Sequence, residues 1–172
     1  MSSTQFTLSI VIAVVIGGLA AFLLWKQRQI YNQGLKEEDK MNAETRQLQL
    51  QAYERLILLA ERIALPNLIS RVNVAGMSLQ EAQYLLVNNI KQEFDYNVTQ
   101  QIYVTQQSWE ALRNLKEQNI LIINQVASFL PAEAQGKDLS RSILEMLSQN
   151  PNASLHAVAT EVLSFEAKKL LK

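Results

Sequence analysis

The chain has 172 residues, of which 16 are basic and 16 acidic, so its formal net charge at pH 7 is zero. It contains no cysteine and one histidine, which excludes disulfides, thiolate nucleophiles and thiolate metal sites. Both signs of charge are spread along the sequence, and no RNP, zinc-finger or glycine-rich phosphate motif occurs, so no nucleic-acid binding is predicted. The length allows a membrane anchor followed by one compact domain.

An uncharged and almost wholly apolar run extends from Phe6 to Trp25, with the sequence FTLSIVIAVVIGGLAAFLLW. At about 1.5 Å rise per residue, a helix of this length crosses a bilayer core of about 30 Å. The alternative, a cleaved signal peptide, would have a basic n-region, a shorter apolar core and a small-residue cleavage site, whereas this run ends in Leu-Leu-Trp-Lys. We therefore expect residues 1–25 to form a short tail and an uncleaved transmembrane helix.

The charges that flank this run predict its orientation. No lysine or arginine precedes it, and the basic residues that follow it closely are Lys26, Arg28, Lys36 and Lys40. The flank that is richer in lysine and arginine stays in the cytoplasm. The sequence therefore predicts a single-pass protein of the cytoplasmic (inner) membrane, with its N-terminus outside and its C-terminal domain in the cytoplasm.

A stripe of small residues, Ala13, Gly17 and Ala21, recurs every four positions along one face of the predicted span. Small residues at this spacing allow a second transmembrane helix to approach closely. The stripe is typical of a homodimer or of a membrane protein partner, although small residues that simply face lipid would give the same pattern. The lipid bilayer itself is the other expected partner.

The rest of the chain divides into a polar juxtamembrane linker, residues 26–40, and a helical domain, residues 41–172. The linker has Gly34 as its one flexible point, and it is either a helical extension of the span or a short tether. In the domain, helical apolar spacing is found in five stretches: 41–65, 78 to about 97, 105 to about 130, around 139–147, and about 153–171. The fold class expected is all-α, with about five helices after the span.

Local signals fix several features of these helices. Ser78 and Glu81 have the spacing of a capping box, Thr105 is a suitable N-cap, and Pro66 is expected to interrupt or kink the first helix. The core face of the second helix is predicted to be Leu79, Ala82, Leu86, Ile90 and Phe94. Trp109 is expected to begin the core stripe of the third, with Asn119 at the edge of that stripe, and the last helix is expected to present Leu155, Val158, Val162 and Phe165.

The residues needed for common catalytic and metal sites are missing from the sequence. His156 has no cysteine or nucleophile elbow nearby, and no Glu-x-x-His pair exists, because the residue three before it is Ala153. The carboxylates of Glu93 and Asp95 should point to different sides of a helix, and Glu54, Arg55, Glu61 and Arg62 fall outside the apolar stripe. We therefore expect no enzyme activity, no cofactor, and no catalytic, cofactor-binding or metal site.

Three segments carry a resemblance to a known family: YERLILLAERI at 53–63, NLISRV at 67–72, and QEFDYNVTQQIYVTQQSWE at 92–110. Here the sequence resembles an uncharacterised bacterial family of small proteins with one N-terminal span and a helical cytoplasmic domain. The resemblance covers most of the chain from Gln47 to about Phe129. It implies the same architecture, but no activity, cofactor or catalytic residue.

Three functions are compatible with this sequence. The first is a membrane-anchored, non-enzymatic helical scaffold or interaction module at the inner face of the cytoplasmic membrane. The second is a structural stalk, like the b subunit of rotary ATP synthases, which should be one long helix with a narrow apolar seam. The third is an enzyme with an unrecognised site. Pro66, Gly76, Pro131 and Pro151 divide the chain into broad-faced helices, and this favours the first function.

The predicted orientation can be tested with reporter fusions placed after Lys172. A reporter that is active only in the cytoplasm should work at this position, because the basic flank of the span holds the domain inside. Activity of a reporter that works only in the periplasm would contradict the orientation.

Overall fold

A computed structural model describes residues 25–29, 40, 42–149 and 155–171 of the chain. It divides into two compact units, Met1–Thr45 and Arg46–Lys172. In the first unit, the described residues 25–29 and 42–45 are helical. The predicted span, apart from Trp25, and the stripe of Ala13, Gly17 and Ala21 lie outside the described residues. Within the described ranges, no helix is both long and apolar enough to cross a membrane.

The second unit is built from helices. The first covers residues 42–63, of which those from Arg46 onward belong to this unit. It is followed by α2 (Leu65–Arg71), α3 (Leu79–Tyr96), the 3-10 helix η1 (Val98–Ile102), α4 (Gln106–Phe129), α5 (Gly136–Gln149) and α6 (His156–Leu170). No strand occurs in the described part of the chain, where Ser78 and Gln135 form one isolated bridge. The all-α prediction is confirmed for these residues.

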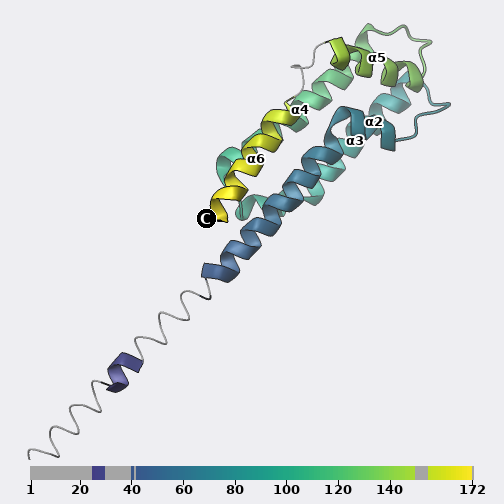
Figure 1. Cartoon of the computed structure of the whole chain (residues 1–172). Helices are drawn as coiled ribbons and strands as arrows, with labels where there is room; N and C mark the ends of the chain where they lie inside the picture. The colour runs from purple at the N-terminus through teal and green to yellow at the C-terminus, as the bar shows by residue number, and fades with distance from the viewer. Residues whose placement is uncertain (1–24, 30–39, 41, 150–154, 172) are drawn as a thin grey trace, which may run out of the picture. The chain divides into compact units, whose positions relative to one another are not determined.

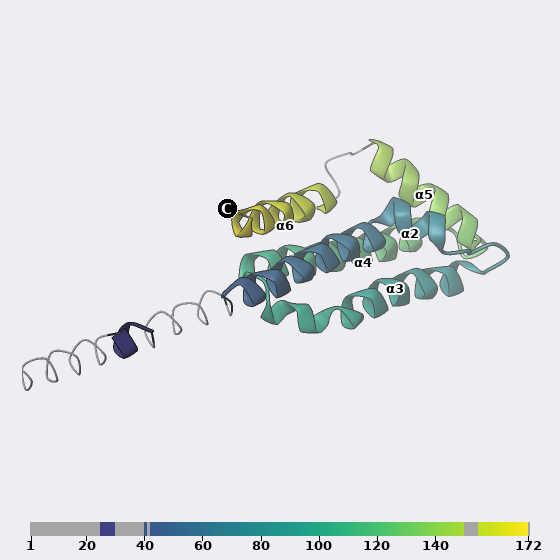
Figure 2. The same ribbon diagram turned by 60° about the horizontal axis from the view of Figure 1, so that its bottom comes forward.

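The long helices of this unit run alongside one another, as the two views agree (Figures 1 and 2). The 42–63 helix, α3, α4 and α6 alternate in direction, and α2 and α5 lie together at one end. Helix α4 packs against α3, α5 and α6, so it has a central place in this unit. One continuous apolar core joins all of these helices.

Helix α3 forms as its sequence predicts. The Ser78 hydroxyl accepts a hydrogen bond from the Glu81 amide, and a Glu81 carboxylate oxygen accepts one from the Ser78 amide at 2.9 Å, which completes the capping box. The predicted core face is buried at all five positions: Leu79, Ala82, Leu86, Ile90 and Phe94. The predicted end near Asn97 is also confirmed, because Asn97 is the C-cap.

Helix α4 begins at the predicted N-cap, since the Thr105 side chain accepts a hydrogen bond from the Ser108 amide. Trp109 is partly buried and packs on the core, with its ring 4.9 Å from that of Phe94. The Phe94 ring also contacts Lys116, whose ammonium group lies 4.5 Å from the centre of the ring. Phe129 at the helix end is exposed.

The last two helices differ in part from expectation. Helix α5 begins at Gly136 rather than near residue 139, because the Gly136 amide donates to the Met77 carbonyl at 3.0 Å. A side chain at position 136 would lie only 2.7 Å from the Ala82 Cβ, so this close approach requires glycine. In α6, Leu155 packs on the core as predicted, but Ala159 and Leu163 are the buried residues, and Val158 and Phe165, predicted on the core face, are exposed. Both faces of this helix are apolar, and only packing on α4 selects between them.

The first helix ends in a sharp break rather than a smooth kink. Ala64 has a ψ of 126°, outside the helical range, and Pro66 stands in the first turn of α2. Pro66 has no amide to donate to the Arg62 carbonyl, and the break separates the neighbouring carbonyls from their usual partners. Side chains replace the missing donors at three successive carbonyls. These bonds are Asn67 Nδ2 to Glu61 O at 2.9 Å, Arg71 Nη2 to Arg62 O at 3.2 Å, and Asn119 Nδ2 to Ile63 O at 2.7 Å.

The expectation that Asn119 lies at the edge of the apolar stripe was therefore wrong. It is 1% exposed, and its amide nitrogen donates to the main chain of another helix. Buried polar groups need such partners, and the interrupted first helix supplies a free carbonyl. The sequence shows the apolar stripe on which Asn119 lies, but not the carbonyl opposite it.

Replacing Asn119 with alanine should destabilise the domain by about 1 to 3 kcal/mol, because the buried Ile63 carbonyl then loses its donor. Chemical denaturation of residues 41–172, followed by circular dichroism, measures this loss. Asn114→Ala on the exposed side of the same helix is the matched control and should change stability by less than about 0.5 kcal/mol. Equal stabilities for the two variants would mean that the buried bond does not stabilise the break.

Candidate functional site

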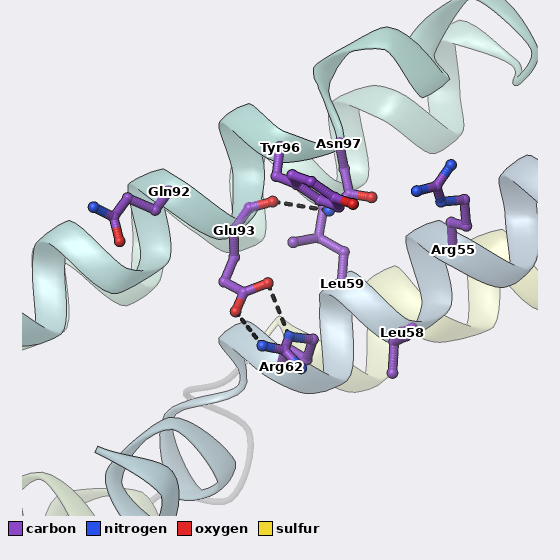
Figure 3. Close-up of a pocket in the computed structure, with 8 residues that line it drawn as sticks. All are labelled: Arg55, Leu58, Leu59, Arg62, Gln92, Glu93, Tyr96 and Asn97. Carbon is purple, nitrogen blue, oxygen red and sulfur yellow. Dashed lines mark hydrogen bonds and ion pairs between the residues drawn. The ribbon is translucent and has the colours of Figure 1, made fainter. Parts of the chain in front are cut away.

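A groove lies between the 42–63 helix and α3 on the described surface of the second unit (Figure 3). Its volume is about 470 Å³. The lining residues are Arg55, Leu58, Leu59, Arg62, Gln92, Glu93, Tyr96 and Asn97, and we call it the Arg62 groove. Every one of them belongs to these two helices or to the cap of α3, so the groove is positioned by rigid elements.

Buried residues form the floor of the Arg62 groove. Leu59 belongs to the main core and is 1% exposed. Asn97 is also buried, and its side-chain amide donates to the Glu93 carbonyl at 2.9 Å, which closes the end of α3. In Figure 3 the Tyr96 ring lies beside Asn97, above Leu59. The floor is therefore fixed by both core packing and helix capping.

An ion-pair cluster lies at one end of the groove. Arg62 donates to both oxygens of Glu93, from Nε to Oε2 at 2.8 Å and from Nη2 to Oε1 at 2.5 Å (Figure 3). Arg71 of α2 approaches the same carboxylate from Nη1 at 3.3 Å. Glu93 is the most shielded member, with a side chain that is 16% exposed. The cluster ties three helical segments together with charge-assisted hydrogen bonds.

The pairing shifts the acid–base behaviour of both main partners. The hydrogen bond from Arg62 lowers the pKa of Glu93, and the charges of Arg62 and Arg71 act in the same direction against the effect of burial. The hydrogen bond to Glu93 in turn raises the pKa of Arg62. Glu93 therefore remains ionised to a lower pH in the folded protein than in the unfolded chain.

The rim of the groove is exposed and largely without internal partners. Tyr96 is 75% exposed and Leu58 58% exposed. The Arg55 guanidinium, also exposed, forms no ion pair or hydrogen bond with any other described residue. Tyrosine and arginine are residue types that act as anchors in protein interfaces, and here they stand with an exposed leucine around a fixed floor.

The balance of charge in and beside the Arg62 groove is positive. Two guanidinium groups, those of Arg55 and Arg62, and one carboxylate, that of Glu93, line the groove, and Arg71 of α2 approaches the same carboxylate. The whole chain has no net charge, so this excess is local. A groove of this kind can bind an anionic or hydrogen-bond-accepting group beside an apolar one.

His156 and Asp95, which were considered as site candidates from the sequence, do not line the Arg62 groove. His156 is at the start of α6, where its Nε2 is 3.1 Å from a carboxylate oxygen of Glu61. Asp95 is exposed and does not belong to the Glu93 cluster. Over the described residues, no group of three or more histidine, aspartate or glutamate side chains is arranged to hold a metal ion.

The Arg62 groove was missed by sequence reasoning. Its ion pairs join positions that are 31 and 22 residues apart, so no local spacing reveals them. The only local signal is that Arg62 and Glu93 each stand directly beside a buried residue, Ile63 and Phe94. Such positions lie at the boundary between core and solvent, where long charged side chains commonly form pairs.

The fold and this groove define an all-α protein whose helical domain carries an exposed, positively charged groove. A family model described as "Family of unknown function (DUF7935)" matches residues 2–170, so the chain belongs to this family. This confirms the resemblance to an uncharacterised family. The comparisons with curated proteins and with solved structures give no match.

The Glu93 cluster predicts a specific dependence of stability on pH. Because its folded-state pKa is lowered, Glu93 stabilises the domain fully above its ordinary value of 4.5, and this contribution is lost as the pH falls through the folded pKa. Glu93→Gln should cost about 1 kcal/mol at pH 7, and the difference from the unsubstituted domain should shrink below pH 4.5.

Denaturant titrations of residues 41–172 at several pH values measure this effect. Glu133→Gln is the matched control, because Glu133 is exposed and forms no ion pair within the described part of the chain. A difference between the Glu93 variant and the unsubstituted domain that stays constant from neutral to acid pH would show that the carboxylate contributes nothing to folding.

Proposed function

We propose that this protein is a membrane-anchored, non-enzymatic interaction module whose helical domain binds a protein partner through the Arg62 groove. Residues 6–25 would anchor it in the cytoplasmic membrane, residues 26–40 would connect the anchor to the domain, and the domain would lie in the cytoplasm. The observation that carries the proposal is the exposed rim of Arg55, Leu58 and Tyr96 above a fixed floor.

The composition of this rim supports binding to a protein surface. Exposed tyrosine and leucine supply apolar area, while Arg55 supplies donors that have no acceptor among the described residues. Tyrosine and arginine often dominate binding energy when a partner excludes water from them. The shape, a shallow groove between two helices, fits another secondary-structure element better than a small molecule that must be enclosed.

The stalk alternative fits the described domain less well. A stalk requires one long helix, whereas this chain breaks at Ala64 and then turns back between α2 and α3 and again at η1. The broad core faces of the helices pack on one another instead of forming a narrow seam. The groove is a surface that such a folded domain offers to a partner.

A second interaction is proposed for the membrane segment. The stripe of Ala13, Gly17 and Ala21 would pack against the same stripe of a second copy, or against a membrane protein partner. This contact would be independent of the Arg62 groove, because it depends on residues of the anchor alone.

Site-specific photocrosslinking in membranes that contain the full chain tests the proposed function. A photoreactive residue at Leu58 should give a discrete adduct with a protein partner, because Leu58 is on the rim of the groove. The matched control is the same photoreactive residue at Leu144, an exposed leucine of α5 outside the groove. Adducts of equal yield at both positions, or at neither, would contradict a partner site at the groove.

A further inference from the structure

The chemistry of the Arg62 groove points to a particular kind of occupant. Building on the proposed function, we infer that the groove binds an amphipathic α-helix of a partner protein, with a carboxylate of that helix paired to Arg55 and its apolar face on Leu58 and Tyr96. Three properties of the groove favour this occupant: the side chains that form its wall, its length and its charge.

The groove wall is formed by side chains of two helices. The main-chain groups along the 42–63 helix and α3 are already bonded within these helices, so they leave no row of free amides and carbonyls for an extended peptide. An extended segment lying here would bury its own unpaired main-chain groups at a cost. An α-helix satisfies its main chain internally and presents only side chains to the groove.

The length of the groove suits such a helix. Arg55 and Arg62 are at opposite ends of its wall, separated by roughly two helical turns, or about 10 Å. A partner helix lying along this distance would contact the groove through side chains spaced three or four positions apart. Leu58 stands between the two arginines, where it would meet the apolar side chains of the partner.

Charge complementarity selects an acidic helix. Glu93 is already bonded to both Arg62 and Arg71, so the cluster as a whole keeps a positive charge. Arg55 adds a second positive charge with no acceptor among the described residues. A lysine-rich helix would place like charges against these groups, whereas a carboxylate would accept directly from the planar guanidinium of Arg55.

Selection from a peptide library against the full chain in nanodiscs tests this inference. The probe is a displayed library of 18-residue helical peptides in which one face is randomised, and it is first depleted on empty nanodiscs. The retained peptides should combine an acidic residue with apolar residues three or four positions away. An enrichment of neutral or basic peptides, or no enrichment at all, would overturn the inference.

Binding of one retained peptide then tests the role of Arg55 directly. Arg55→Ala should weaken binding roughly tenfold, since it removes a charge-assisted pair. Arg141→Ala, which removes an exposed arginine of α5, is the matched control and should leave the affinity within about twofold. Equal loss in both variants would indicate a general charge effect and would overturn the specific pairing.

Reversal of the charge at position 55 tests the pairing with the acidic residue of the peptide most directly. Arg55→Glu should abolish binding of the acidic peptide, and replacing the acidic residue of that peptide with lysine should restore it. Displacement of the peptide by an oligonucleotide would identify nucleic acid as the class of ligand and would overturn the inference. If crosslinks form at Leu58 in membranes but the selected peptides do not depend on Arg55, the proposed function stands and only this inference fails.

Discussion

The break between residues 63 and 66 is the constraint on which the arrangement of the domain depends. Three consecutive residues before it each contact a different helix. The Glu61 carboxylate lies 3.1 Å from His156 of α6, the Arg62 side chain pairs with Glu93 of α3, and the Ile63 carbonyl accepts from Asn119 of α4. A regular helix would have used this carbonyl internally, so the interruption by Pro66 is what makes it available.

The same break produces the Arg62 groove. Because the chain turns at Ala64, the short helix α2 lies beside the end of the first helix, and its Arg71 contacts both the Arg62 carbonyl and the Glu93 carboxylate. One arginine thus caps the broken helix and at the same time compensates the charge of Glu93. The groove is therefore tied to a structural element, and variants at Arg62 or Arg71 would alter stability together with any binding. Arg55 and Leu58 lie outside this cluster, so they separate the two effects.

Local sequence signals predicted the parts of the fold that depend on neighbours in the chain. The Ser78–Glu81 cap, the buried face of α3 and the Thr105 cap each arise within one or a few turns, and all are confirmed. The position of Asn119 and the buried face of α6 could not be predicted, because each is decided by another helix. The groove could not be predicted either. Arg62, Arg71 and Glu93 come from three separate segments, and no spacing within the sequence indicates that they meet.

The packing of Trp109 on Phe94 has a spectroscopic consequence. The chain has two tryptophans, and the other, Trp25, is in the first unit and is 61% exposed. A fragment of residues 41–172 retains Trp109 alone, at the contact between α3 and α4. The fluorescence of this fragment would then report on one helix contact, whereas that of the intact chain would also contain the signal of Trp25 in the first unit.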